Sequence, residues 1–308
     1  MHRRARLAAV TDQIAPSRLV VTGAGGQLGR ALLRLAAART ATDYPGAPAV
    51  IGYARTELDI TDPDAVRAAL RPGDTVVNCA AFTAVDLAET EVAAAYAGNE
   101  TGPATLAAAC AETGARLIHL STDYVFPGNG SSPYETTDPT GPATVYGKSK
   151  LAGEQAISAI DGNSTIVRTA WVYTGTGTDF VATMLRLERE RDTVSVVDDQ
   201  LGCPTYAVDL AAGLLELAAR PDAPRILHAT NAGQASWFEF ARAVFELAGA
   251  DPDRVLPCDS AAFPRPAPRP AYSVLSNRSW AAAGLTPLRP WRAALADALD
   301  PDQPDGVD

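Results

Sequence analysis

One segment near the start of the chain restricts its fold more than any other: a short apolar strand that runs into a glycine-rich turn and then a helix. The strand is expected over Arg18 to Thr22, and Gly23, Gly26 and Gly29 follow in a G-x-x-G-x-x-G frame. In dinucleotide-binding folds such glycines allow a tight turn, close approach of the backbone to a pyrophosphate, and helix–strand packing. Because the helix N-terminus presents free amides, the segment predicts a nucleotide cradle rather than a plain turn.

Apolar runs and helical patterns alternate through the first half of the chain. Strands are expected at 49–53, 75–78 and 116–121, with helices at 64–70 and 101–113 between them. Strands that alternate with helices and are apolar along their length are typical of a parallel sheet covered on both faces. Right-handed crossovers then favour a doubly wound, Rossmann-type α/β fold.

The rhythm of the pattern loosens after residue 170, which suggests a division of the chain. We expect a flexible extension over 1–17, an NAD(P)-binding Rossmann domain over 18–170, and a smaller, mainly substrate-binding α/β region over 171–308. Some segments of the last region are expected to return to the central sheet. The run 263–270, rich in proline and arginine, cannot join a helix interior or a ladder, so it predicts a loop that could close over a ligand.

The composition excludes several classes of function. A formal net charge of −10 argues against a general nucleic-acid binder, which needs a basic stripe. No segment approaches the roughly 20 apolar residues of a membrane span. The four cysteines and three histidines show no spacing that would hold a metal ion. We therefore expect a cytoplasmic protein with reduced cysteines, no membrane or nucleic-acid partner, and no assignable metal ligand.

The chain contains only two lysines, and both lie within residues 146–150. On a helix expected over 144–159, a four-residue spacing places Tyr146 and Lys150 on one face, whereas Lys148 points away. A neighbouring ammonium favours the phenolate and lowers the pKa of a tyrosine, which is ordinarily near 10. A tyrosine tuned in this way can deliver a proton to a carbonyl oxygen while a hydride arrives at carbon. The pair therefore predicts carbonyl reduction, and Lys150 can also hold the nicotinamide ribose.

A hydroxyl group is expected at the end of the strand 116–121, where ligands bind in doubly wound sheets. Ser121 and Thr122 are both candidates for a hydrogen bond to a substrate carbonyl. Neighbouring residues on a strand point to opposite faces, so one of the two is expected to be only a packed or capping hydroxyl. Spacing does not decide between them.

The residues after the second strand bear on the cofactor. An NAD-selective fold usually has an acidic residue there, which binds the ribose 2′-hydroxyl. This chain has Arg55 instead, which could receive a 2′-phosphate. The sequence therefore favours NADPH, with NADH as the alternative, because Arg55 could equally be a surface charge.

Six motifs spread over the chain form a specific set. They are GAGGQLG at 23–29, NCAAFTAVD at 78–86, STDYVF at 121–126, YGKSK at 146–150, RTAWVY at 168–173 and DQLGCPT at 199–205. Together they resemble the extended short-chain dehydrogenases, and more narrowly the dTDP-4-dehydrorhamnose reductase family. The likeness covers nearly everything from Arg18 to about Leu299.

The resemblance implies roles for individual residues. Tyr146 would be the proton donor, and Lys150 would adjust the pKa of Tyr146. Thr122 would supply the hydroxyl that completes the catalytic set. Thr122, Asp123 and Trp171 match positions that touch the sugar nucleotide. With the glycine turn and Arg55, the expected cofactor contacts are Gly23, Gly26, Gln27, Leu28, Gly29, Arg55, Asp59, Ile60, Ala80, Ala81, Phe82, Tyr146 and Lys150. Phe82 stands where many relatives have a polar aromatic residue or histidine, so its contacts are expected to differ from theirs.

The implied activity is NAD(P)H-dependent reduction of the C4 ketone of a dTDP-4-dehydro-6-deoxy-L-sugar. The product would be dTDP-L-rhamnose or a close relative such as dTDP-L-dihydrostreptose, a sugar of antibiotic synthesis. The alternatives are a nucleotide-sugar epimerase with tightly bound NAD and a non-catalytic NADP-binding regulatory subunit; the complete catalytic set argues against the latter. Because some relatives form metal-assisted dimers, a homodimer and Mg²⁺ are further expectations, although no spacing locates the metal ligands.

Overall fold

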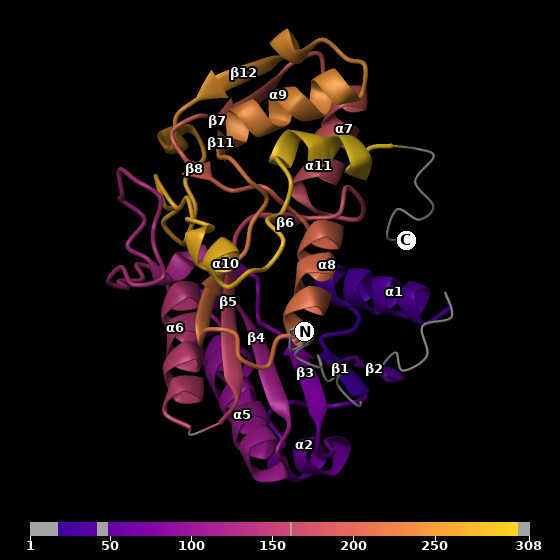
Figure 1. Ribbon diagram of the computed structural model, residues 1–308. Coiled ribbons are helices and arrows are strands. Elements are labelled where there is room, and N and C mark those ends of the chain that lie inside the picture. Colours follow the sequence, from indigo (N-terminus) through magenta and orange to yellow (C-terminus); the bar gives the residue numbers. More distant parts are fainter. Residues whose placement is uncertain (1–17, 42–48, 161, 301–308) are drawn as a thin grey trace, which may run out of the picture.

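A six-stranded parallel sheet organises the protein in the computed structural model, which describes residues 18–41, 49–160 and 162–300 (Figure 1). The extension predicted over 1–17 lies outside the described residues. In spatial order the strands are β10 (Ile226–His228), β5 (Ser164–Thr169), β4 (Arg116–Thr122), β3 (Asp74–Asn78), β1 (Arg18–Thr22) and β2 (Ala49–Tyr53). The strand order reverses between β1 and β3, so the predicted doubly wound, Rossmann-type fold is confirmed.

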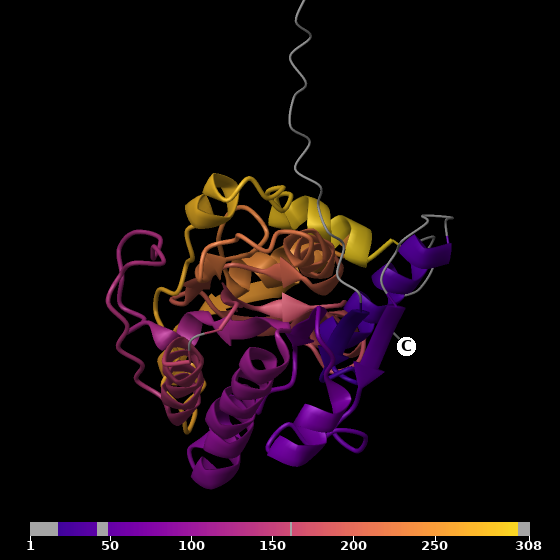
Figure 2. The same cartoon turned by 60° about the horizontal axis from the view of Figure 1, so that its bottom comes forward.

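Helices cover both faces of this sheet because successive strand residues point to opposite sides. The helices are α1 (Gln27–Ala41) and α8 (Ala207–Ala218) on one face, and α2 (Pro63–Ala69), α5 (Gly102–Thr113) and α6 (Val145–Ser158) on the other. Within β1, Leu19 and Val21 pack toward α1 and α8, whereas Val20 packs toward α2 and α5. Figure 2 shows the magenta helix α5 on one side of the sheet and the orange and yellow segments on the other.

Local sequence signals explain where several helices begin. Asp62 accepts hydrogen bonds from the first amides of α2, and Pro63 occupies its first position. The helix α9 (Trp237–Leu247) begins at a capping box, in which Ser236 and Glu239 each bind the other's backbone amide. Both helices are thus positioned by side chains within a few residues of their starts.

The C-terminal part of the chain forms a second lobe beyond one end of the sheet (Figure 1). Its core is apolar and includes Tyr173, Val181, Phe240 and Val244. The lobe contains α7 (Phe180–Glu190), β7 (Val194–Val197), α9, β12 (Val255–Cys258) and α11 (Trp291–Ala298), with the strand pairs β6 (Val172–Tyr173)–β9 (Thr205–Tyr206) and β8 (Leu201–Gly202)–β11 (Ala235–Ser236). The helix α8 and the strand β10 return from this half of the chain to the sheet.

Short elements complete the fold. They are α3 (Val85–Ala88), α4 (Val92–Tyr96), a π-helical turn η1 (Ala97–Thr101), α10 (Arg278–Ala282), and three 3₁₀ turns, η2 (Asp123–Val125), η3 (Pro252–Arg254) and η4 (Ser260–Ala262). The run 263–270 adopts neither helix nor strand, as its prolines predict.

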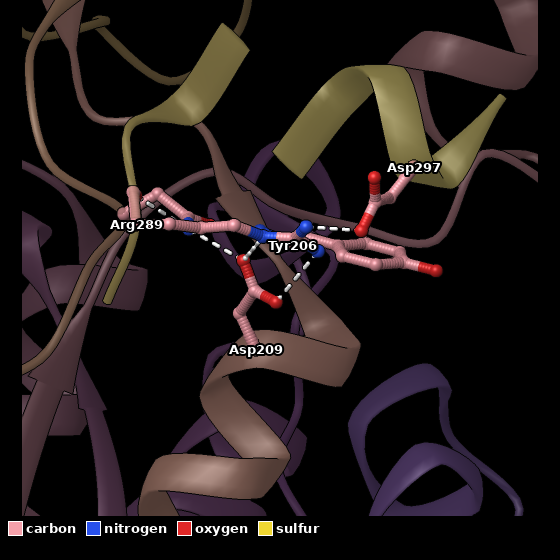
Figure 3. Close-up of polar contacts among 5 residues, drawn as sticks. Tyr206, Asp209, Arg289 and Asp297 are labelled. Carbon is pink, nitrogen blue, oxygen red and sulfur yellow. Dashed lines mark hydrogen bonds and ion pairs between the residues drawn. The ribbon is translucent and has the colours of Figure 1, made fainter. Parts of the chain in front are cut away.

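Arg289 ties the helix α11 to the sheet domain (Figure 3). Its guanidinium binds both carboxylate oxygens of Asp209 on α8, at 2.8 and 2.9 Å, and also pairs with Asp297 on α11. Asn231 donates to Asp209 at 2.7 Å and accepts from the Tyr206 amide at 2.7 Å. The hydrogen bonds with Asp209 in particular raise the pKa of Arg289 above its ordinary value. The network therefore fixes α11 against α8.

We predict that Arg289→Met lowers the free energy of unfolding by about 2 kcal/mol, because it removes charged hydrogen bonds to Asp209 and leaves that carboxylate with Asn231. Arg292→Met is the matched control, since Arg292 pairs with Glu246 at 3.3 Å on the exposed surface and such pairs contribute little. Urea denaturation followed by circular dichroism measures both variants. Equal losses of stability would contradict the role of the network.

Candidate active site

A cleft of about 1620 Å³ lies between the sheet and the second lobe, next to the point where the strand order reverses. Doubly wound sheets bind their ligands at this place, outside the carboxyl ends of the strands. The structure brings every site residue predicted from the sequence into the lining of this one cleft. These residues are Gly23, Gly26, Gln27, Leu28, Gly29, Arg55, Asp59, Ile60, Ala80, Ala81, Phe82, Thr122, Asp123, Tyr146, Lys150 and Trp171.

Two glycines of the turn, Gly23 and Gly29, are too tightly packed to accept side chains. Gly23 has a φ of 71°, and a Cβ atom there would lie 2.5 Å from the Ala80 amide nitrogen. A Cβ atom on Gly29 would lie 2.3 Å from the Gly23 carbonyl oxygen. The turn therefore places the N-terminus of α1 against the cleft, where its free amides and dipole favour phosphate groups. The residues present fit the diphosphate of a dinucleotide.

The other end of the predicted cofactor site lies after β2. Asp59 accepts hydrogen bonds from the Thr61 amide at 2.9 Å and the Thr61 hydroxyl at 2.8 Å, and these hold its pKa below the ordinary value. Arg55 lines the cleft nearby. The carboxylate of Glu57 accepts from the Ala54 amide at 2.7 Å and therefore caps this turn. A basic rather than an acidic side chain faces the cleft directly after β2.

The helix α6 presents Tyr146 and Lys150 to the cleft. Its N-cap is Thr144, whose hydroxyl accepts from the Gly147 amide at 3.0 Å. The Lys150 side chain is buried, and its ammonium donates to the Leu120 carbonyl at 2.6 Å. Burial lowers the pKa of Lys150 to about 8, against the opposing charge of Glu154.

The direction predicted for the pKa of Tyr146 is wrong. Burial raises the pKa of Tyr146 to about 12, a hydrogen bond with Thr122 acts against this rise, and the charge of Asp123 adds to it. Burial penalises the phenolate, and the Lys150 ammonium is directed at the Leu120 carbonyl. Sequence spacing gave the shared face of the helix correctly, but it carried no information about burial.

The structure gives different surroundings to the two hydroxyls at the end of β4. Ser121 donates to Glu154 of α6 at 2.5 Å, and Glu154 in turn forms a buried two-point pair with Arg168 at 2.7 and 2.9 Å. Thr122 donates to Asp123 at 3.0 Å and accepts from the Tyr124 amide at 3.2 Å. The Ser121 hydroxyl therefore belongs to a buried ion-pair network, which makes it the packed hydroxyl of the two.

Burial changes the acidity of Asp123, the carboxyl group next to Thr122. It raises the pKa of Asp123 to about 6, although hydrogen bonds, including one from Thr122, act in the opposite direction. Asp123 is 3 % exposed and belongs to the η2 turn. A carboxyl group in this position accepts a hydrogen bond when charged and can donate one when protonated.

Trp171 is held in a strained conformation on the lobe side of the cleft. Its φ of 47° is rare for a bulky residue. Its indole stacks on that of Trp237, with centroids 3.5 Å apart and planes inclined by 8°, and Phe180 packs against Trp237 at 4.5 Å. Gly202 makes this possible, because a Cβ atom there would lie 2.4 Å from the Trp171 ring. These surroundings keep the indole in the cleft.

An ion pair beside the cleft, between Arg269 and Asp86, was not predicted from the sequence. Arg269 donates to Asp86 at 2.8 Å, and the Ala267 amide donates to the same carboxylate at 3.2 Å. Burial would raise the pKa of Asp86, but these two contacts lower it overall. The pair anchors the run 263–270 to α3. Arg269 is one of two arginines in that run, yet nothing local indicates its partner, which lies 183 residues away.

The part of the chain that the structure describes lacks two features, a metal-binding cluster and a membrane-spanning helix. No group of three or more His, Cys, Asp or Glu side chains there could hold a metal ion, so the expected Mg²⁺ has no candidate site among them. No helix in those ranges is long and apolar enough to cross a membrane.

The fold and the cleft define a nicotinamide-dependent oxidoreductase of the Rossmann type. The chain belongs to the family described as RmlD substrate binding domain, which matches residues 17–303. It is 58% identical over 287 residues to the dTDP-4-dehydrorhamnose reductase of Mycobacterium tuberculosis, covering 92% of each chain.

Two solved structures are similar in fold. A dTDP-4-dehydrorhamnose reductase from Clostridium acetobutylicum superposes with a TM-score of 0.85 at 39% identity, over 92% of this chain and 98% of that one. The dTDP-4-dehydrorhamnose reductase of Bacillus anthracis, in complex with NADP, gives a TM-score of 0.83 at 36% identity, over 91% of this chain and 97% of that one. The suspected family is thereby confirmed.

We predict that Gly202→Ala displaces the Trp171 indole, because the new methyl group would lie within 2.6 Å of three ring atoms. The strong near-ultraviolet circular dichroism expected of two indoles stacked at 3.5 Å should then be largely lost. Gly141→Ala is the control, since its Cβ atom would come no closer than 3.6 Å to its neighbours. An unchanged spectrum for Gly202→Ala would contradict the proposed packing.

Proposed function

We propose that the chain reduces the C4 ketone of a dTDP-4-dehydro-6-deoxy-L-sugar with a nicotinamide cofactor. The observation that carries this proposal is that Thr122, Tyr146 and Lys150 line the same cleft as the glycine turn. The names of the Mycobacterium tuberculosis and Bacillus anthracis relatives support dTDP-4-dehydro-L-rhamnose as the first substrate to consider. A related 6-deoxysugar, such as the precursor of dTDP-L-dihydrostreptose, fits the same chemistry.

Tyr146 is the proposed proton donor. With a pKa raised to about 12 by burial, its hydroxyl keeps its proton throughout the neutral range, as a donor must. The bound nicotinamide supplies the hydride, and the Tyr146 proton goes to the C4 oxygen. Thr122 would hydrogen-bond the same oxygen and orient the ketone. The charged form of Lys150 would offset the negative charge left on Tyr146 and hold the nicotinamide ribose.

The sugar nucleotide is proposed to lie toward the second lobe. Asp123, Trp171 and Arg269 line the cleft, and Arg269 is paired with Asp86. A sugar ring packs well against the flat face of an indole, and a carboxyl group can fix a sugar hydroxyl. The glycine turn would hold the cofactor diphosphate on the opposite side.

Three further predictions belong to this proposal and stay predictions. They are the division of roles between residues 18–170 and 171–308, a homodimer, and a cytoplasmic location. Mg²⁺ is not part of the proposed chemistry.

The proposed reaction is tested by mixing the protein with NADPH and dTDP-4-dehydro-L-rhamnose and following absorbance at 340 nm. We predict net oxidation of NADPH by the wild type. Tyr146→Phe should lower turnover by about 100-fold or more, because only the proton donor is removed, and should leave the Kd for NADPH nearly unchanged. A nucleotide-sugar epimerase would instead retain its cofactor through purification and consume none. Wild-type turnover in Tyr146→Phe would end the role proposed for this residue.

We propose that NADPH is preferred to NADH. Arg55 lines the cleft after β2, and the neighbouring Glu57 carboxylate is bound to the Ala54 amide. Arg55→Ala should weaken NADPH binding by about tenfold and leave NADH binding nearly unchanged, because one charged hydrogen bond to the 2′-phosphate is lost. Titration of the free protein with each cofactor, followed by nucleotide fluorescence, measures this. An equal loss for both cofactors would contradict the preference.

A further inference from the structure

A buried chain of hydrogen bonds runs beneath the cleft to Lys150, and its other members have no role in the proposed reaction. It begins at Thr22, at the end of β1, and passes through Asn78 of β3 and His119 of β4 to Lys150 of α6. The successive distances are 2.7 Å from Thr22 Oγ1 to Asn78 Oδ1, 2.9 Å from Asn78 Nδ2 to His119 Nδ1, and 3.4 Å from His119 Nε2 to Lys150 Nζ. Thr22, Asn78 and His119 are each at most 1 % exposed.

The orientation of the Asn78 amide is determined by its neighbours. One of its terminal atoms receives the Thr22 hydroxyl at 2.7 Å and the Ala80 backbone amide at 3.1 Å. A backbone amide can only donate, so this atom is the oxygen. The atom that faces His119 is therefore the amide nitrogen, which can only donate to the imidazole.

This orientation selects the tautomer of His119. Burial, together with the charge of Lys150, holds the pKa of His119 well below its ordinary value, so the ring is neutral. A neutral imidazole has one donor and one acceptor nitrogen. Since Nδ1 accepts from Asn78, the proton resides on Nε2, the nitrogen that faces Lys150.

We propose that His119 is a positioning residue that presents an N–H group to Lys150 and thereby favours the uncharged amine of that lysine. An uncharged amine satisfies both neighbours, because its lone pair accepts from His119 Nε2 while one N–H donates to the Leu120 carbonyl. An ammonium has no lone pair and would face the Nε2 proton unfavourably. This effect on the protonation of Lys150 does not depend on the proposed function. Its consequence for catalysis does rest on the role proposed for Lys150.

The other titratable groups around Lys150 come from α6 and from the segment after β3. Glu154, on the same helix, favours the ammonium, but its carboxylate is shared with Arg168 and Ser121. Cys79, in the segment after β3, acts in the same direction when charged, yet burial raises its pKa to about 12 and keeps it a thiol in the neutral range. Tyr146, one turn earlier on α6, keeps its proton there as well. His119 is the group that opposes the charge of Lys150 through a direct contact.

The same chain connects the lysine to the glycine turn. Thr22 immediately precedes Gly23, and the Ala80 amide that binds Asn78 belongs to a residue lining the cleft. One set of buried hydrogen bonds therefore fixes the cradle and the lysine together, across three strands and a helix.

Because the chain contains only two lysines, the pKa of Lys150 can be measured directly. In protein labelled with ¹³C at the lysine ε-carbon, only Lys148 and Lys150 give signals, and the exposed Lys148 is the internal reference. Lys148→Arg assigns the two signals. We expect Lys150 to titrate near pH 8 in the wild type.

Three variants of His119 separate its two contacts. The amide of glutamine reaches the position of Nε2, that of asparagine reaches the position of Nδ1, and phenylalanine keeps the ring without either nitrogen. His119→Asn and His119→Phe should raise the pKa of Lys150 by about half a unit to one unit, which corresponds to one ordinary hydrogen bond. His119→Gln should leave it within about 0.2 unit of the wild type. If the phenylalanine variant does not fold, the asparagine and glutamine variants decide.

An unchanged or lowered pKa of Lys150 in His119→Asn would overturn the proposal, since a lowered value means that Nε2 accepts from the ammonium. The titration uses the free protein, so its outcome does not depend on turnover. Failure to reduce any dTDP-ketosugar would overturn the proposed function and leave the titration standing. If both hold, the alkaline limb of turnover against pH should move upward in His119→Asn and stay in place in His119→Gln.

Discussion

The burial of Lys150 beneath the cleft is the constraint on which the rest of the site depends. An amino group removed from water needs polar partners, and here the Leu120 carbonyl at 2.6 Å and His119 supply them. To reach them, α6 must pack very closely on the sheet and its neighbours. Gly147 and Gly153 allow this, since Cβ atoms there would lie 2.3 Å from the Tyr124 carbonyl oxygen and 2.0 Å from that of Asn99. The helix that carries Tyr146 is therefore positioned by backbone contact, and the tyrosine with it.

The second lobe completes the cleft because it is fixed to the sheet domain at several separated points. The Arg289 network connects α11 to α8, and Arg269 connects the run 263–270 to Asp86 on α3. On the lobe side of the cleft, the strained backbone of Trp171 turns its indole onto Trp237. Local strain of this kind persists only where the surroundings determine it, which here means Gly202 and the aromatic neighbours.

Sequence reasoning predicted the features that depend on local pattern. The glycine turn, the apolar strands β1 to β4 and the shared face of Tyr146 and Lys150 all follow from spacing within a few residues. The strand β5 was not predicted, because Ser164, Thr165 and Arg168 interrupt its apolar pattern, and the two-residue strands of the lobe are too short to show one. The pKa of Tyr146 and the partners of Trp171 and Arg269 depend on burial and on residues distant in the chain. Such contacts leave no periodic signal.

The central claim is that one cleft brings a phenol, a lysine and a nicotinamide together around a sugar ketone. A crystal structure of the protein with NADP⁺ and dTDP-L-rhamnose tests it most directly. The account predicts the sugar C4 hydroxyl within hydrogen-bond distance of both Tyr146 and Thr122, with the nicotinamide ring on the opposite side of C4. A sugar whose C4 faces away from Tyr146, or a nicotinamide bound away from Lys150, would contradict it.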